Sequence, residues 1–465
     1  MAGSVAHAQA RRAPATRIDW PAFLARQDLV WDRLPKGWGE SAFIGNGRIG
    51  ATIDVQDARL GWTINRTDFV HAQSRFPIGR VLVKTAGTPT DGNARLTLWD
   101  AEASGVLTTD RGEVRWRSFV SMEPSVIVIA LEGIGGERAV DLDWVPAEAR
   151  PPRKVARREA FAPEDLHPAA VVTRLSNDIT SVQTFISGGA HAESIRRAGR
   201  SGRATVFYVS IGQGQTDQAA VREARGATAA AAQRGLTTLT TAHRRWWHAY
   251  YPASFVSFPD PRLEAYYWIQ IYKLGSAMRE NGPILDLAGP WFRHTPWPAI
   301  WWNLNIQLTY SPLFTANRLG LAESLFRNLD RNRRALMENV PERMRGEAAA
   351  IGRSSGPDLV RTVDLATAQS DAAPAALKQG TPAPAQAGGN QAAPAATQPK
   401  KIVQAFRASR PNRLRQAPAR RSSTAVTCVC PDSSSWSTPA ARARSAATGR
   451  GQEAVIAPIS SASET

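Results

Sequence analysis

A change in hydrophobic periodicity near Gly226 separates two kinds of sequence in this chain. Up to Gly212, short runs rich in β-branched and aromatic residues alternate with Gly, Pro and Asp, and helical spacing is almost absent. The runs that predict strands are Ala51–Val55, Leu60–Asn65, Val81–Lys84, Arg95–Trp99, Val106–Thr109, Val114–Val120, Ser125–Leu131, Ala139–Trp144, Ala170–Leu175 and Ala204–Ile211. Many short strands at such spacing indicate an antiparallel β-sandwich, which we assign to residues 17–226.

After Gly226, apolar residues recur three and four positions apart, as on one face of a helix. Asp260 and Pro261 supply an N-cap and a first-turn proline, so a helix is predicted over 261–280. A helical linker is predicted over 227–258, and further helices are predicted up to residue 353. The three apolar sets are Leu239, Ala242, Trp246 and Tyr250; Leu263, Tyr267, Ile271, Leu274 and Met278; and Ala322, Leu325, Phe326, Leu329, Leu336 and Val340.

The last part of the chain, 354–465, has a different composition. It is dominated by Ala, Pro, Gln, Ser, Thr and Arg, and Thr381–Gln398 is almost entirely Ala, Pro, Gly, Gln and Asn. Such a segment buries too little apolar surface to offset the entropy lost on ordering, so we expect a disordered tail. A high-GC gene translated out of frame yields the same composition, and a frameshift is the second interpretation.

The formal charge of +17 raises nucleic acid as a partner. Residues 361–465, however, hold thirteen Lys and Arg against five Asp and Glu, which is nearly half of the excess. The other basic residues are scattered among acids without a nucleic-acid-binding motif, so no specific nucleic-acid partner is expected. No apolar run reaches the length of about eighteen residues that a membrane helix needs, so no membrane span is expected.

The only cysteines, Cys428 and Cys430, are too close for an easy disulfide and too few for a zinc site. No metal and no other cofactor is expected. At the N-terminus, Ala6-His7-Ala8 and Ala8-Gln9-Ala10 match the small-x-small pattern of a signal-peptidase site. We expect residues 1–16 to be the end of a signal peptide, which predicts a periplasmic or secreted protein. A disordered terminus on a cytoplasmic protein is the alternative.

The segment Gly289–Pro312 carries the functional signal. It reads GPWFRHTPWPAIWWNLNIQLTYSP, with Pro290, Pro296 and Pro298 favouring an irregular loop. Indole rings stack on the apolar faces of sugars, and amides both donate to and accept from hydroxyls. The amide pair points to one side only if the backbone is extended. The predicted substrate-binding residues are Trp291, Trp297, Trp301 and Trp302, and the predicted catalytic pair is Asn303 and Asn305. A buried connection between helices is the alternative interpretation.

This segment resembles the start of the catalytic barrel in glycoside hydrolases related to the inverting α-L-fucosidases. That family has Leu-Gln-Gly-Leu-Trp, then Pro-Trp, Asn-x-Asn and Tyr-Trp-Pro. The counterparts here are Leu287–Trp291, Pro296-Trp297, Asn303-Leu304-Asn305 and Tyr310-Ser311-Pro312. The turn Ile44–Gly50 also resembles a Gly-Asn-Gly-Arg-Leu-Gly turn of the family's sandwich domain. It lacks the Lys-Ser/Thr of a phosphate loop, so we expect a structural role for it.

The resemblance implies a multidomain β plus α fold, in which an N-terminal antiparallel β-sandwich precedes an (α/α)₆ six-hairpin barrel. About ninety residues separate Asp260 from Gly352, whereas twelve helices need roughly 200. We therefore expect 259–353 to form an incomplete barrel. In the family a Glu serves as acid, and an Asp polarises the water that the Asn-x-Asn pair holds. This chain departs from the pattern, because neither carboxylate has a counterpart and Glu323, Glu338 and Glu342 are expected at the surface.

Two functional hypotheses follow. The first is a glycoside hydrolase-like protein that, by resemblance, hydrolyses α-L-fucosyl or related glycosidic bonds with inversion, in a chain that lacks the acid and base. The second is a non-catalytic protein that binds carbohydrate. Whether the chain is an enzyme stays open at this point, as do the sugar, the linkage and the oligomeric state.

Overall fold

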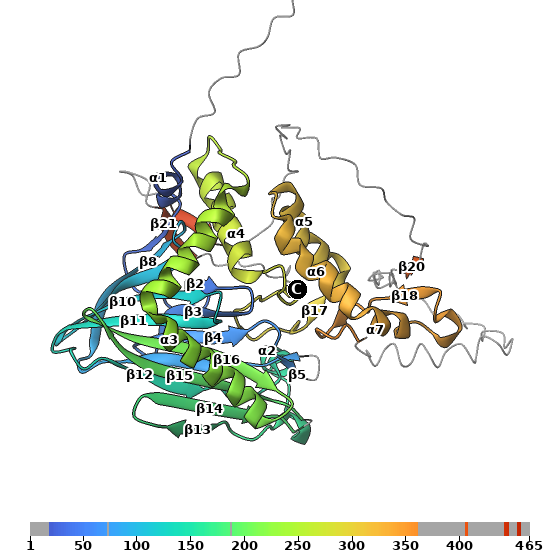
Figure 1. Cartoon of the computed structure of the whole chain (residues 1–465), viewed down its shortest axis with the longest axis horizontal. Coiled ribbons are helices and arrows are strands. Elements are labelled where there is room, and N and C mark those ends of the chain that lie inside the picture. Colours follow the sequence, from blue (N-terminus) through green and yellow to red (C-terminus); the bar gives the residue numbers. More distant parts are fainter. Residues whose placement is uncertain are drawn as a thin grey trace, which may run out of the picture.

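The computed structural model describes residues 18–71, 74–186 and 188–360. It also describes the backbone of three short strands, Ala405–Arg407 (β20), Ala441–Ser445 (β21) and Glu453–Ile456 (β22). Two antiparallel sheets make up the N-terminal part, and helices follow (Figure 1). The predictions for residues 1–16, for Cys428 and Cys430, and for most of 354–465 fall outside the described residues.

The larger sheet has eleven strands, and its neighbours pair in an antiparallel manner throughout. One face of its strand β8 is polar and exposed at every second residue, as expected of a sheet with one solvated face. The strand order is β13 (Val171–Arg174), β14 (Asp178–Thr184), β15 (Ala190–Ser201), β16 (Ala204–Gly214), β11 (Val126–Gly135), β10 (Gly112–Ser121), β9 (Glu102–Thr109), β8 (Pro89–Thr97), β1 (Leu29–Trp31), β21 and β22.

The smaller sheet packs face to face with the larger one. Trp62 of the smaller sheet and Trp116 of the larger sheet meet edge to face, with ring centroids 5.9 Å apart, and both are buried. Every run predicted as a strand overlaps a strand, whereas β1, β2, β5, β6, β14 and β15 were not predicted. The order is β12 (Asp141–Pro146), β7 (Gly79–Lys84), β4 (Arg59–Arg66), β3 (Ile49–Gln56) and β2 (Ala42–Gly45), and β5 (Val70–His71) pairs separately with β6 (Ser74–Arg75).

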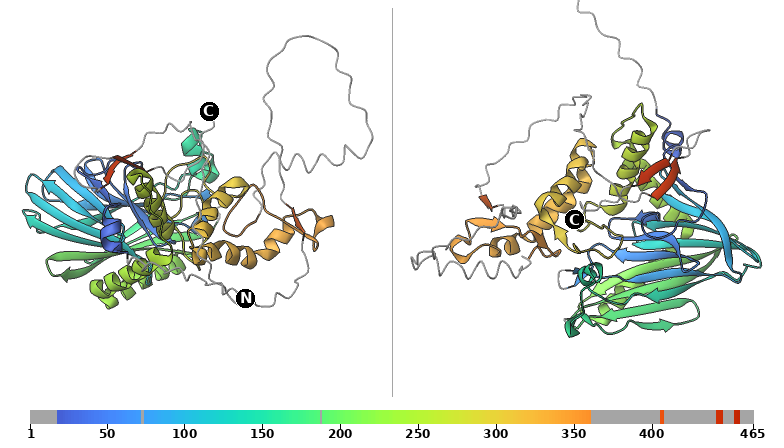
Figure 2. Two further views of the ribbon diagram at one scale, coloured as in Figure 1. Left: turned by 90° about the horizontal axis from the view of Figure 1, so that it is seen from above. Right: turned by 180° about the vertical axis from the view of Figure 1, so that it is seen from behind.

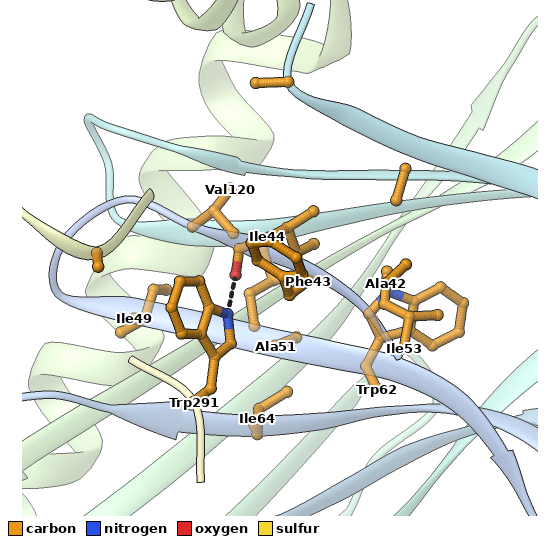
Figure 3. Close-up of a cluster of buried hydrophobic side chains, with 14 of the residues drawn as sticks. Ala42, Phe43, Ile44, Ile49, Ala51, Ile53, Trp62, Ile64, Val120 and Trp291 are labelled. Atoms are coloured by element: carbon orange, nitrogen blue, oxygen red, sulfur yellow. Dashed lines mark hydrogen bonds between the residues drawn. The ribbon is translucent and has the colours of Figure 1, made fainter. Parts of the chain in front are cut away.

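Strands β2 and β3 are buried on both faces, which is unusual for an antiparallel sandwich. The larger sheet covers one face. The side chain of Trp291 covers the other, where its ring meets Phe43 and its indole N–H donates to the backbone carbonyl of Ile44 (Figure 3). This second covered face is the junction between the sheets and the segment that carries the tryptophans.

Helix α3 (Asp217–Tyr250) lies along the larger sheet (Figure 1). It begins ten residues before the predicted linker helix, at a Thr216 cap whose hydroxyl accepts from the amide of Ala219. The missed first turns bury only small side chains, Ala220 and Ala224, so they lack the large apolar residues by which a helical face is recognised. Small residues at this spacing let the helix approach the sheet closely.

Two glycines in α3 are expected to respond to alanine in opposite directions. Gly226 is helical and has open space around it, so Gly226→Ala should stabilise the protein by about 0.5–1 kcal/mol. Gly235 has φ 73° and ψ 158°, a region nearly restricted to glycine, so Gly235→Ala should destabilise by about 1–3 kcal/mol. Urea unfolding followed by circular dichroism measures both. A gain in stability from Gly235→Ala would contradict the non-helical backbone that Gly235 adopts within this helix.

The helices after α3 are short. Helix α4 begins at Pro261 behind an Asp260 cap, as predicted, and ends at Ala277. The single amphipathic helix predicted to follow is instead two helices, because Asn332 leaves helical geometry between them, and Phe326 on the predicted apolar face is 47% exposed. The elements outside the sheets are α1 (Trp20–Ala25), α2 (Pro152–Arg157), α4 (Pro261–Ala277), β17 (Ile300–Trp301), a π-helix (Trp302–Ile306), α5 (Gln307–Thr315), α6 (Leu319–Arg331), α7 (Arg333–Glu338), β18 (Ala348–Ala350) and β19 (Ser354–Ser355).

Helices α5, α6 and α7 project to one side of the two sheets, as both views in Figure 2 show. The large antiparallel region and the accompanying helices agree with the predicted β plus α organisation. The (α/α)₆ arrangement stays a prediction. In the described part of the chain, no helix is both long and apolar enough to cross a membrane.

Candidate functional site

The loop between α4 and β17 is fixed to the sandwich by a buried ion pair. Arg75 donates to both carboxylate oxygens of Asp286 at 3.1 Å, and their side chains are 2% and 6% exposed. Arg75 also donates to the carbonyl of Gly289 and, over 2.7 Å, to the side chain of Asn65. Asp286 in turn accepts from the amides of Ala288 and Gly289 at 3.0 and 2.7 Å. One guanidinium and one carboxylate therefore set the path of the loop.

The glycine-rich turn Ile44–Gly50 is the surface on which this loop rests. Asn46 closes the turn, since its side-chain oxygen accepts from the amides of Arg48 and Ile49, both at 3.0 Å. The amide of Gly47 donates to Ser276 at the end of α4 over 2.7 Å. A Cβ on Gly50 would lie 2.9 Å from the side chain of Pro290. The turn makes structural contacts, which agrees with its predicted role.

Trp291 is buried against the sandwich. Its side chain is 7% exposed, and its indole N–H donates to the carbonyl of Ile44 over 3.0 Å (Figure 3). Its ring meets Phe43 edge to face at 5.2 Å. These contacts give Trp291 a packing role in the junction.

Trp302 is also buried and faces a different part of the core. It is 8% exposed, and its indole N–H donates to the hydroxyl of Ser355 over 2.8 Å. Strands β17 and β19 pair here, and the amide of Trp302 donates to the carbonyl of Arg353 over 3.0 Å. Trp302 therefore holds the segment 353–355 against the tryptophan loop.

Trp297 and Trp301 are the two predicted tryptophans that the structure brings together. Their ring centroids are 5.7 Å apart with planes inclined at 54°, and both side chains are half-buried. The guanidinium carbon of Arg353 lies 5.4 Å from the centroid of Trp301. The indole N–H of Trp301 has no acceptor among the described residues. We call Trp297, Trp301 and Arg353 the indole platform.

Asn303 and Asn305 come just after Trp301 in the chain, within the π-helix Trp302–Ile306. The extended backbone that would place both amides on one side is therefore not what this segment adopts. Leu304 between them has φ 70°, which an L-residue rarely takes, and Asn305 is half-buried. Their assignment as a water-holding pair stays a prediction.

The carboxylates of the helical part do not provide an obvious acid or base. Glu323, Glu338 and Glu342 are exposed, as expected. Glu338 pairs with Arg334 at 2.7 Å, and Glu323 lies 3.7 Å from Arg327. Across the described ranges, no group of three or more His, Cys, Asp or Glu side chains is arranged to hold a metal ion.

Three residues at or near this site were not predicted from the sequence. Arg75 lies 211 positions before its partner Asp286, so no local pattern reveals the pair. Arg353 lies directly before the segment whose composition predicts a disordered tail. The only sequence signal for Asp286 is its place just before the Leu287–Trp291 motif.

No protein-family model matches the sequence, and the curated proteins contain no significant match. Solved structures give weak likenesses. A protein assigned as a kojibiose phosphorylase from the human microbiome is 10% identical with a TM-score of 0.45, and the match covers 70% of this chain and 48% of that one. A bacterial glucoamylase complexed with acarbose is 10% identical with a TM-score of 0.40, covering 72% and 56%.

An alpha-mannosidase of family GH92 from Bacteroides thetaiotaomicron is 9% identical with a TM-score of 0.24, covering 56% of this chain and 41% of that one. The chain thus spans about half the length of the solved structures it matches. These structural neighbours are glycoside hydrolases and a glycoside phosphorylase. At this level of similarity they assign neither a family nor a reaction to the chain.

Proposed function

We propose that this chain is a glycoside hydrolase-like protein that binds carbohydrate at the indole platform. The observation that supports the proposal is the pairing of Trp297 with Trp301, half-buried and flanked by Arg353. Inclined indole faces suit the apolar faces of a pyranose, while a guanidinium suits its hydroxyls. The half-buried Asn305 lies in the π-helix that follows Trp301 and would add an amide to the same ligand.

The sequence resemblance supplies the finer part of the proposal. It favours α-L-fucosyl or related glycosidic bonds as the substrate class, with inversion at the anomeric carbon. The small-x-small pattern at Ala6–Ala10 favours a periplasmic or secreted location.

Binding without turnover is the second candidate function, and the carboxylates of the described residues favour it. Inversion needs one carboxylic acid and one carboxylate about 6.5–9.5 Å apart. Asp286, which precedes the platform in the chain, is held by Arg75 and by two amides. A carboxylate with its lone pairs occupied in this way is a poor base, so Asp286 is assigned a positioning role.

Removing one platform indole is expected to weaken carbohydrate binding without unfolding the protein. Trp301→Ala should reduce affinity for a fucosylated oligosaccharide by about five- to tenfold. A stacked aromatic ring contributes about 1–1.5 kcal/mol in addition to the burial of its apolar surface. Asn305→Ala should also weaken binding, through a lost hydrogen bond. Isothermal titration calorimetry gives the affinities, and circular dichroism melting curves report on the fold.

Trp99→Ala is the matched control, because Trp99 is half-buried and stacks on His248 away from the platform. Unchanged affinity in Trp301→Ala, with an unchanged melting curve, would refute the site. Release of an aryl group from aryl glycosides distinguishes hydrolysis from binding. Turnover that survives purification and inverts the anomer would support the hydrolase over the binding protein.

A further inference from the structure

Trp297 lies between two prolines, which limits how its backbone can be held in place. Neither Pro296 nor Pro298 has an N–H group, so each can accept a backbone hydrogen bond but cannot donate one. The amide of Trp297 itself donates to the hydroxyl of Thr295 over 3.2 Å. The path of the backbone at Trp297 therefore depends in large part on what binds the two proline carbonyls.

Both carbonyls accept hydrogen bonds from residues of the sandwich. The carbonyl of Pro298 accepts from the backbone amide of Arg75 over 2.9 Å. The carbonyl of Pro296 accepts from Nε of Arg153 over 3.0 Å, although Arg153 lies 143 positions earlier in the chain. These bonds hold the chain on either side of Trp297, so the sandwich fixes the backbone from which this indole projects.

Arg153 belongs to helix α2, in the connection 147–170 between β12 and β13. The connection leaves the smaller sheet beside β7, since the amide of Ala147 donates to the carbonyl of Ile78 over 3.0 Å. Ile78 and Arg75 lie in the same short segment between β6 and β7. The two contacts with the prolines therefore start from one corner of the sandwich.

Helix α2 is held within this connection by an ion pair. Lys154 pairs with Asp165, and Asp165 also accepts from the amide of Ala162 over 2.7 Å. Pro152, at the first position of α2, is buried. Because its helix is anchored in this way, Arg153 loses less conformational entropy when it binds the tryptophan loop.

We propose that Arg153 is a positioning residue of the indole platform. Its bond to the carbonyl of Pro296 keeps Trp297 at 5.7 Å and 54° from Trp301, so both indole faces are in place before a sugar binds. A loop that is ordered beforehand loses less entropy on binding, which raises the affinity. This inference rests on the proposed binding of carbohydrate at the platform, and it adds a residue of the sandwich to that site.

Removing the donor of Arg153 should weaken carbohydrate binding without unfolding the protein. Arg153→Met keeps the aliphatic stem and should reduce affinity for fucosyllactose by about three- to fivefold. Arg153→Lys keeps a charged donor and should retain most of the affinity. Arg157→Met is the matched control, because Arg157 lies on the same helix, is 52% exposed and is 3.7 Å from Glu159. Isothermal titration calorimetry measures these affinities.

A double-mutant cycle with Trp297→Ala shows whether Arg153 acts through Trp297. In the Trp297→Ala background, Arg153→Met should change the affinity by less than about twofold, because the ring that Arg153 positions is gone. An equal loss of affinity in both backgrounds would overturn the proposal. It would mean that Arg153 contributes to binding independently of Trp297.

Measurements without ligand separate this inference from the proposed function. The coupling of the Trp297 and Trp301 indoles contributes to the circular dichroism spectrum, and Trp297→Ala identifies this contribution by removing it. Arg153→Met should reduce the same contribution while the melting curve stays unchanged. Hydrogen exchange at the amide of Trp297 should become faster in Arg153→Met and not in Arg157→Met.

The outcomes distinguish the two ideas. If the unmodified protein binds no fucosyllactose but Arg153→Met reduces the indole contribution, the proposed function fails and the positioning of Trp297 by Arg153 stands. Unchanged circular dichroism and unchanged exchange in a folded Arg153→Met protein would overturn the positioning role. Arg153→Gln, whose shorter side chain does not reach Pro296, replaces Arg153→Met in each assay if that variant fails to fold.

Discussion

Arg75→Met is expected to lower the free energy of unfolding by about 3–5 kcal/mol, because it leaves the buried carboxylate of Asp286 without its partner. In the native protein, the ion pair and the amides of Ala288 and Gly289 together offset the cost of removing the Asp286 carboxylate from water. The two amides alone do not offset this cost. Urea unfolding measures the loss. Hydrogen exchange should show increased opening in the loop 285–291.

A matched control separates this effect from the loss of an arginine as such. Arg334 pairs with Glu338 at 2.7 Å but is 91% exposed, so Arg334→Met should leave the free energy of unfolding nearly unchanged. The double variant Arg75→Met with Asp286→Leu should be less destabilised than the two single changes predict together, because it removes both charges. Strict additivity would show that the two groups do not stabilise each other.

Gly47→Ala should loosen the junction between the sandwich and the tryptophan loop. Gly47 has φ 84°, and a Cβ there would lie 2.6 Å from the backbone carbon of Met278 and 2.8 Å from the side chain of Arg279. Left-handed strain costs about 1–2 kcal/mol for an L-residue, and the clash with backbone adds about 1–3 kcal/mol. We expect a total loss of about 2–5 kcal/mol, measured by urea unfolding.

Gly37→Ala measures the cost of positive φ for an alanine where its Cβ meets no neighbouring atom. Gly37 has a similar φ of 72°, but no atom lies within 4 Å of the position that an alanine Cβ would take, so only the backbone strain applies. Its loss should be about 1–2 kcal/mol. Equal losses at the two glycines would mean that the contact with the end of α4 contributes nothing.

Much of the β-rich part was predictable because period-2 patterns and turn residues act locally. The hairpin of β9 and β10 turns at Asp110-Arg111, as its sequence indicated, and Asp260 with Pro261 starts α4 where predicted. Strand β15 was missed because its first half is buried and its second half is polar. The first turns of α3 were missed because their buried residues are small.

The partners of the tryptophans in the segment 289–312 could not be predicted from the sequence. The sequence showed that Trp291, Trp297, Trp301 and Trp302 are close along the chain, and that amides follow them. The tertiary structure placed Trp291 against β2, turned Trp302 towards Ser355, and paired Trp297 with Trp301. The amides lie in a π-helix rather than in extended backbone.

The sequence by itself therefore determined the elements whose signals are local: most of the strands of the two sheets, the turn between β9 and β10, and the start of α4. The tertiary structure alone decided which indoles are buried and which carboxylate is neutralised. Local periodicity sets backbone conformation through contacts between near neighbours. Burial and charge pairing join residues as distant as Arg75 and Asp286, and a side chain's chemistry depends on the partners that packing brings to it.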